Sequence, residues 1–257
     1  MERIDDGLVF LTPEDYRVLG EADFGVPGLI AHELVGPFVD VQAVGPMIMV
    51  HDGRFEPRHG IGHHPHRYNE RLFYILEGAV DHDDALNGIQ GHMPAGSVGQ
   101  LTEGLAGMLH KEWNNTDGPG RAFILVYETQ PVPPRASFAL LEDGDAPRYR
   151  EDGGAETKEL VGARSPLRIN GDVRLFADSA LGAGTELTQP VGPGEALLLY
   201  TLDGQIDVSD GAKVSLPFEH TLLMAPSREG SSVVLRSEAQ SRVIRVVAGL
   251  GHGLVFR

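Results

Sequence analysis

Cysteine is absent from this chain of 257 residues. Its absence excludes disulfide bonds and thiolate chemistry, and a reducing compartment fits the composition. No apolar run approaches the ~20 residues that a membrane-spanning helix needs, and the first residues lack the charged-then-apolar pattern of a signal peptide. We therefore expect a cytoplasmic protein that makes no contact with membranes.

Positive charge is also scarce. The chain has 21 Lys and Arg residues against 37 Asp and Glu residues, for a formal net charge of -16. Such a surface repels the phosphate backbone unless basic residues cluster, and the sequence shows no such cluster. Direct binding of nucleic acid is therefore not expected, and the acidity is consistent with simple solubility.

Long segments with helical periodicity are few, whereas the chain contains 33 glycines and 17 prolines. This composition indicates many short strands joined by turns, and hence an all-β fold. Alternating or wholly apolar segments of strand length support it. The strands expected are 38–44, 46–51, 72–76, 108–113 and 122–127 in the first half, and 172–176, 196–202, 221–224, 232–235 and 242–247 in the second.

A faint internal repeat divides the chain. Residues 74–81 align without gaps on residues 200–207, and both segments have the pattern of one β-hairpin with a glycine turn. A proline-rich break at 130–135 and a polar stretch at 142–158 lie between the copies. We therefore expect an N-terminal domain and a C-terminal domain, with a connecting segment that runs over the surface between them. The limits are 1–133, 134–159 and 160–257.

Histidine is concentrated in the first copy, where eight of the eleven lie between His51 and His110. Alternate residues of a strand share one face, so His64 can point with His66, and His110 with Glu112, into one space. Three imidazoles and a carboxylate suit a borderline divalent metal such as Fe, Mn, Ni, Cu or Zn and leave coordination positions open. The sequence predicts a reactive metal site.

The second copy lacks these residues. The 126-residue offset carries His64, His66 and Glu70 onto positions that cannot bind a metal, namely Pro190, Gly192 and Ala196. Its two histidines, His220 and His252, belong to no paired motif. We expect one metal ion, held by the N-terminal copy alone.

The ordered set of residues resembles the pirin family of the cupin superfamily. The resemblance is carried by a His-Pro-His-Arg segment, a following glutamate, a Leu-Glu-Gly segment and a His-x-Glu pair. The matching residues are His64, Pro65, His66, Arg67, Glu70, Tyr74, Leu76, Glu77, Gly78, His110 and Glu112. It implies a bicupin, a chain of two jelly-roll β-barrels.

Two carboxylates compete for the fourth position on the metal. In many cupins the glutamate of the first motif ligates, which would be Glu70, whereas the pirin pattern favours Glu112. Glu70 is then a residue that orients the imidazoles or a carboxylate of the pocket. His63 adjoins the site and could support it, whereas the other histidines of this region are expected at the surface or in loops, namely His59, His82 and His92.

The resemblance implies a dioxygenase of the quercetin 2,3-dioxygenase type, with Fe(II) as the metal and with O2 and a phenolic small molecule as substrates. Glu112 would accept the proton of the substrate hydroxyl and return it. Apolar residues near the motifs could line a pocket for a flat ring, although for each of them a place in the barrel core is the stronger interpretation. These residues are Ile61, Tyr68, Phe73, Leu105, Met108 and Trp113.

The chain departs from the pirin pattern beside the motifs. Tyr68 and Asn69 stand where pirins usually have glycine and an aromatic residue, and the segment 102–108 is one residue longer. The substrate therefore stays open to another phenolic or enolisable compound. Two other roles remain: a redox-sensing regulator that binds a transcription factor through a protein surface, and an inert metal-binding cupin with a filled barrel.

Overall fold

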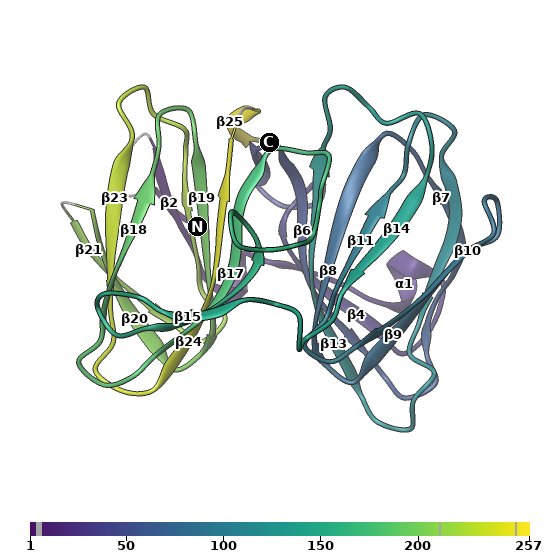
Figure 1. Cartoon of the computed structure of the whole chain (residues 1–257), viewed down its shortest axis with the longest axis horizontal. Coiled ribbons are helices and arrows are strands. Elements are labelled where there is room, and N and C mark those ends of the chain that lie inside the picture. The colour runs from purple at the N-terminus through teal and green to yellow at the C-terminus, as the bar shows by residue number, and fades with distance from the viewer. Residues whose placement is uncertain (4–6, 211, 250) are drawn as a thin grey trace.

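The computed structural model describes residues 1–3, 7–210, 212–249 and 251–257. Two barrels lie side by side, and each consists of a large and a small antiparallel sheet (Figure 1). Helical structure in the described residues is limited to the 3-10 turn η1 (Pro13–Asp15) and to α1 (Glu21–Phe24). The all-β prediction is confirmed. No helix in this part of the chain is long and apolar enough to cross a bilayer.

The N-terminal barrel carries the histidine-rich segment on its small sheet. That sheet has the order β10 (Ile89–Pro94), β9 (Ala79–Asp84), β12 (Met108–Trp113) and β7 (Gly60–His66). Its large sheet has the order β14 (Ser137–Leu141), β11 (Val98–Thr102), β8 (Asn69–Glu77), β13 (Gly120–Glu128), β6 (Met47–Phe55), β4 (Leu29–Val35) and β3 (Arg17–Leu19). Two further strands extend it, β5 (Val41–Gly45) against β6 and β25 (His252–Phe256) against β5.

The C-terminal barrel repeats this arrangement. Its large sheet has the order β1 (Glu2–Arg3), β2 (Leu8–Leu11), β22 (Thr221–Met224), β19 (Ala196–Asp203), β24 (Ser241–Ala248), β17 (Val173–Leu181), β16 (Glu156–Val161) and β15 (Arg148–Arg150). Its small sheet has the order β18 (Glu186–Val191), β23 (Ser231–Arg236), β20 (Gln205–Asp210) and β21 (Ala212–Pro217). Each of the ten strands expected from the sequence overlaps one of these strands.

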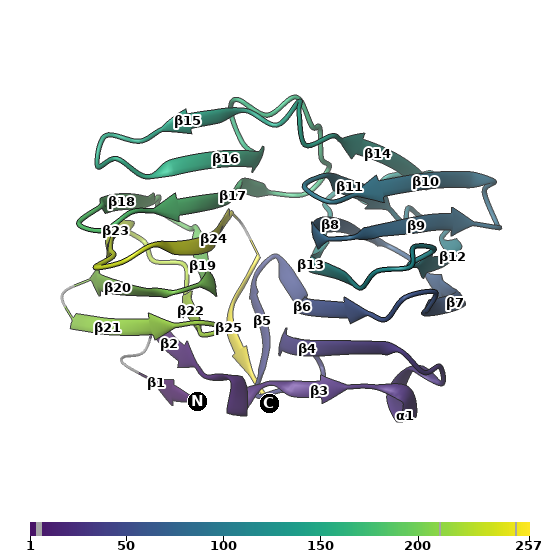
Figure 2. The same ribbon diagram turned by 90° about the horizontal axis from the view of Figure 1, so that it is seen from below.

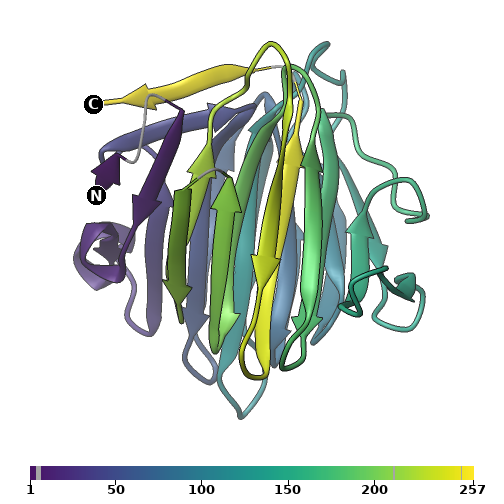
Figure 3. The same cartoon turned by 90° about the vertical axis from the view of Figure 1, so that its left-hand side faces the viewer.

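Each end of the chain adds a strand to the barrel formed mainly by the opposite half of the sequence. Near the N-terminus β2 pairs with β22 of the C-terminal barrel, and at the C-terminus β25 pairs with β5 of the N-terminal barrel (Figure 2). Both ends consequently lie at the same edge of the molecule (Figure 3). The domain limits expected from the sequence take no account of this exchange, because strand pairing between distant segments leaves no local signal.

The stretch expected to run as a surface connection, 134–159, instead contributes strands to both barrels. In it β14 pairs with β11 of the N-terminal barrel, whereas β15 pairs with β16 at the edge of the large C-terminal sheet. An edge strand has one side free of neighbours and tolerates polar residues, which explains why this stretch resembles a loop in sequence.

The two large sheets pack face to face in the middle of the molecule, so alternate residues of a strand enter different cores (Figure 1). In β8, Leu72 and Tyr74 lie in the core between the barrels, whereas Phe73 and Ile75 lie inside the N-terminal barrel. This alternation decides which neighbouring side chains can reach the histidines.

Reciprocal contacts between the barrels support the internal repeat. The hydroxyl of Tyr74 donates to Asp178 Oδ2 at 2.5 Å, and the hydroxyl of Tyr200 donates to Asp52 Oδ2 at 2.8 Å. The tyrosines are related by the 126-residue offset, and so are the two aspartates. Each barrel thus uses the same pair of positions to hold the other.

Candidate metal centre

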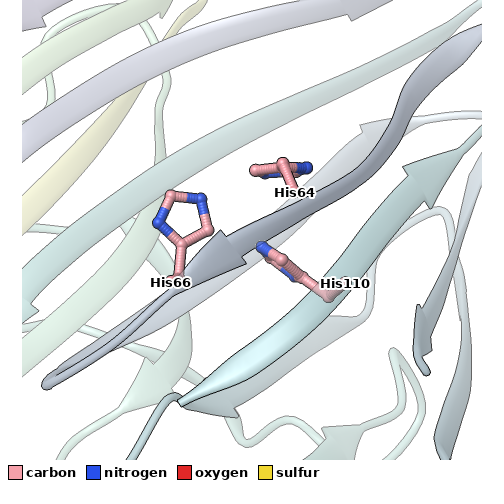
Figure 4. A group of neighbouring side chains, drawn as sticks. All are labelled: His64, His66 and His110. Carbon is pink, nitrogen blue, oxygen red and sulfur yellow. The ribbon is translucent and has the colours of Figure 1, made fainter. Parts of the chain in front are cut away.

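Strands β7 and β12 are neighbours in the small sheet and bring the two sequence motifs together. His110 lies directly opposite His64 in the antiparallel register, and a register shift follows between His110 and Glu112. The imidazoles of His64 and His66 project from one strand towards that of His110 on the next (Figure 4). The alternation predicted from the sequence therefore places three imidazoles in one space.

The three rings are close enough to share one ion. Their centroids are 4.7 Å apart for His64 and His66, 4.6 Å for His64 and His110, and 5.0 Å for His66 and His110. One possible ligand atom from each lies within 4.8 Å of those of the others. Neutral imidazoles at this separation can bind a divalent transition metal.

Glu112 adjoins the three histidines on the buried side. Its Oε1 lies 2.6 Å from His110 Nδ1, and its Oε2 lies 4.0 Å from His64 Nε2. The side chain faces inward with those of Met108 and His110, because these three residues alternate along β12. Among the described residues the possible ligand atoms form two close groups, one from His64, His66 and His110 and the other from His82, His110 and Glu112. His110 belongs to both, so Glu112 adjoins the three histidines but is grouped with His82.

His64 has a defined tautomer. Its Nδ1 lies 2.8 Å from the carbonyl oxygen of Gly62, which can only accept a hydrogen bond, so the proton resides on Nδ1. Nε2 then keeps its lone pair. A hydrogen bond from the ring nitrogen that does not bind the metal commonly orients a metal-binding histidine.

The surroundings keep the donor atoms in their metal-binding protonation states. Burial lowers the pKa of His64, and burial together with the Arg71 guanidinium lowers the pKa of His66 to about 2. Burial alone would raise the pKa of Glu112, but the neighbouring His110 and His64 outweigh it and lower this pKa to about 2. At neutral pH these two imidazoles are therefore neutral and the carboxylate is charged.

The fit of a metal ion is indicated by buried polar atoms that have no hydrogen-bond partner. Among the described residues these are His82 Nδ1, His110 Nδ1, His110 Nε2 and Glu112 Oε1. Leaving buried polar atoms unsatisfied costs about 1–3 kcal/mol each. A shared cation would remove part of this cost, so the donor set fits a metal.

His82 is a neighbour of the site that the sequence did not reveal. It was expected at the surface, but its side chain is buried, lies opposite Glu112 in the register of β9 and β12, and stacks on Phe138. Its Nδ1 lies 3.9 Å from Glu112 Oε1. Because aspartate is rare in strands, the aspartates around His82 make this segment resemble a loop in sequence. It is a short strand, and its inward positions are Val80, His82 and Asp84.

Glu70 does not reach the histidines, contrary to its interpretation as an alternative ligand or supporting residue. It shares a strand face with Leu72 and Tyr74, so its carboxylate is buried outside the N-terminal barrel. There it accepts hydrogen bonds from the side chains of Gln100, Thr102 and Tyr127, and from the backbone and side chain of Asn170. Glu70 joins the two barrels.

His63 also lies outside the site, although it was considered as a supporting residue. Because neighbouring residues of a strand point to opposite faces, His63 is exposed on the outside of the small sheet, where its Nε2 lies 3.0 Å from Asp83 Oδ2. His92 is exposed as expected and contacts Asp81. His59 is half-buried and lies in the turn before β7.

A cavity of ≈ 210 Å³ inside the N-terminal barrel opens onto His64, His66 and Glu112. Ile61 and Phe73 line it as proposed, whereas Tyr68 and Leu105 are exposed and Met108 belongs to the barrel core. The sequence did not reveal three polar residues on its far wall, Glu33, His51 and Arg71. Each of these residues alternates with apolar neighbours along its strand, β4, β6 or β8. This alternation is the feature of the sequence that could have identified them as inward-facing.

Both clusters of possible metal ligands found in the described residues lie in the N-terminal barrel. In the C-terminal barrel the positions equivalent to His64 and Glu70 are Pro190 on β18 and Ala196 on β19.

Comparison with known proteins points to one family. The family model described as Pirin matches residues 22–126. A pirin-like protein from Solanum lycopersicum is 27% identical over 239 residues, covering 90% of this chain and 79% of its own. A Pseudomonas aeruginosa protein named "Putative quercetin 2,3-dioxygenase" is 30% identical over 202 residues, covering 74% of this chain and 68% of its own.

Solved structures share the fold. A quercetin 2,3-dioxygenase from Acinetobacter baumannii superposes with a TM-score of 0.75 at 21% identity, covering 93% of this chain and 86% of its own. A bacterial pirin from Escherichia coli in complex with nickel(II) gives a TM-score of 0.74 at 15% identity, covering 95% of this chain and 100% of its own.

Proposed function

This chain belongs to the pirin family, and we propose on that basis that it is a metal-dependent dioxygenase of a flavonol or of a related phenolic or enolisable small molecule. One divalent metal ion would be held in the N-terminal barrel by His64, His66, His110 and Glu112. Fe(II) is our choice by family resemblance, because the same donors accept Mn, Ni, Cu or Zn. The C-terminal barrel would bind none.

The observation that carries this proposal is the cavity that ends at the candidate ligands. His64, His66 and Glu112 line it together with mostly apolar side chains. A site that only stored a metal, or that only changed its redox state, needs no such space beside the ion. The cavity therefore supports turnover of a small molecule over the alternative role of a redox-sensing regulator.

When bound, a redox-active metal supplies a Lewis acid for a hydroxyl group of the substrate and a redox centre for the reaction with O2. Glu112 is deprotonated, but its low pKa makes it a weak base. It would accept the proton of that hydroxyl group at a carboxylate oxygen, and later return it, only where the bound metal has lowered the pKa of the hydroxyl. The apolar walls, which include Ile61, Phe73 and Ile124, hold a flat ring and exclude water.

Aerobic screening of the iron-loaded protein against phenolic and enolisable compounds tests the proposal, with oxygen uptake and carbon monoxide release both recorded. We expect oxygen uptake with at least one compound, abolished in His64→Ala/His66→Ala and retained in His92→Ala. Carbon monoxide release would assign the reaction to the quercetinase type. No oxygen uptake by the fully loaded protein across the panel would contradict the proposal.

A further inference from the structure

The cavity of the N-terminal barrel has two polar ends on opposite sheets. His64 and Glu112 project into it from the small sheet, and His51 and Glu33 line it from β6 and β4 of the large sheet. Most of the remaining wall is apolar. A molecule held at the candidate metal site would therefore meet a second polar group at the far side of the cavity.

His51 and Glu33 form a buried pair. The exposed fraction of Glu33 is 0% and that of His51 is 9%, and Glu33 Oε2 lies 3.0 Å from His51 Nε2. The other oxygen of Glu33 accepts a hydrogen bond from the backbone N–H of Phe38 at 2.7 Å. Both carboxylate oxygens are thus engaged, and the pair has a fixed orientation.

This orientation defines the role of the second ring nitrogen. A carboxylate favours the proton on Nε2, so Nδ1 keeps a lone pair. Within the described residues Nδ1 has no hydrogen-bond partner, and it is not among the fully enclosed unsatisfied atoms. An imidazole whose one nitrogen is held by a buried carboxylate, while the other remains able to accept, is the arrangement of a general base.

The size of the cavity limits what can reach His51. Its volume of ≈ 210 Å³ is below the ~300 Å³ at which pockets for drug-sized ligands begin. A single ring with small substituents fits this space better than the three rings of a flavonol do. Among the described residues that line the cavity, the imidazoles are those of His64, His66 and His51.

We propose that the preferred substrate is a one-ring phenol or enol and that His51 is a catalytic base for its hydroxyl group at the end remote from the metal. This inference rests on the proposed function and specifies its substrate class. In the step, the O–H bond of the substrate breaks and an N–H bond forms at His51 Nδ1. The electron pair stays on the substrate oxygen, and Glu33 stabilises the resulting imidazolium.

Binding of two phenols to the protein as purified, with its metal content recorded, tests this inference. Under anaerobic conditions nitrohydroquinone, whose two hydroxyl groups lie at opposite ends of one ring, and quercetin are titrated separately, and the absorption band of each reports its binding. We expect the wild-type protein to bind nitrohydroquinone at least tenfold more tightly than quercetin. Tighter binding of quercetin, or no binding of nitrohydroquinone, would overturn the inference without the need for any variant.

Two substitutions separate the roles of the ring nitrogens. The amide of His51→Gln occupies the position of Nε2 and keeps the contact with Glu33, whereas the amide of His51→Asn occupies the position of Nδ1 and keeps an acceptor in the cavity. Loss of one buried hydrogen bond weakens binding about tenfold. We expect this loss in His51→Gln, a smaller loss in His51→Asn, and unchanged affinity in the surface control His92→Gln.

Equal affinities of wild type and His51→Gln would overturn the role of His51, as would an equal loss in the Gln and Asn variants, which indicates a purely structural role. Failure of the proposed function is distinguishable because the readout is binding. Protein that binds nitrohydroquinone through His51 without consuming O2 contradicts the dioxygenase alone. If the wild-type protein takes up oxygen and His51→Gln binds the one-ring probe as tightly as the wild type does, only the role of His51 as a base is contradicted.

Discussion

Glu112 Oε1 lies 2.6 Å from His110 Nδ1, yet the two atoms do not form a well-oriented hydrogen bond. Buried polar atoms are normally paired, and a shared cation would supply the partner that these two atoms lack. The strand alternation places both side chains on the inner face of β12. A cation bound by both side chains would explain why the Glu112 carboxylate lies among imidazoles inside the barrel.

Replacing the carboxylate should weaken the metal site without unfolding the protein. Glu112→Gln keeps the volume of the side chain but removes its charge. We expect metal affinity to fall at least tenfold, because even residues that only support ligands contribute 10–100-fold. Competition with a chelator measures this change, and affinity equal to that of the wild type would show that Glu112 is not a ligand.

His82 should support the site from behind Glu112. His82→Leu removes the buried Nδ1 that lies 3.9 Å from Glu112 Oε1. We expect metal affinity to fall about tenfold, the lower end of the range for residues that orient ligands. His92→Leu on the neighbouring strand is the matched control, because His92 is exposed. Equal chelator competition curves for both variants would exclude this role.

Glu70 should matter for folding and not for metal binding. Glu70→Ala leaves several buried donors without their acceptor, among them Tyr127 and Gln100. We expect the free energy of unfolding in urea to fall by about 3 kcal/mol or more, with unchanged metal content. Glu77→Ala, an exposed position on the same strand, should change neither quantity. Loss of metal from folded Glu70→Ala would restore Glu70 as a candidate ligand.

The stability of the metal-free protein should depend on His66 in mildly acidic solution. The pKa of His66 is lowered to about 2 in the folded chain, against about 6.5 in the unfolded chain. As pH falls below about 6.5 the unfolded chain binds a proton that the folded chain does not, so stability decreases over this window by up to about 1.4 kcal/mol per pH unit.

Urea unfolding at pH 7.5 and 5.5 measures this dependence after the metal has been removed. His66→Leu carries no titrating group at the position, so its stability should fall less between the two pH values than that of the wild type. Parallel losses in the two proteins would show that His66 has an ordinary pKa in the fold.

Sequence patterns predicted the features that depend on short-range alternation. The segments 108–113 and 221–224 are strands with the expected bounds, and the offset that relates Tyr74 to Tyr200 also relates their partners Asp178 and Asp52. A repeat and an alternating face are local properties, which is why they can be seen without coordinates.

The remaining features depend on contacts between distant segments. Glu70 and Arg71 are adjacent, and only the packing of the two large sheets determines that Arg71 enters the cavity while Glu70 joins the barrels. The exchange of β2 and β25 between barrels is likewise a long-range pairing. His82 was missed because its strand is rich in aspartate, which is rare in strands.

Metal content measured by elemental analysis tests the central claim most directly. The wild-type protein, loaded with Fe(II) and freed of excess ion, should hold about one metal ion per chain, as one set of four ligands requires. His64→Ala/His66→Ala should hold almost none, whereas His92→Ala should match the wild type. Unchanged metal in the folded double variant, or two tightly bound ions in the wild type, would contradict the account.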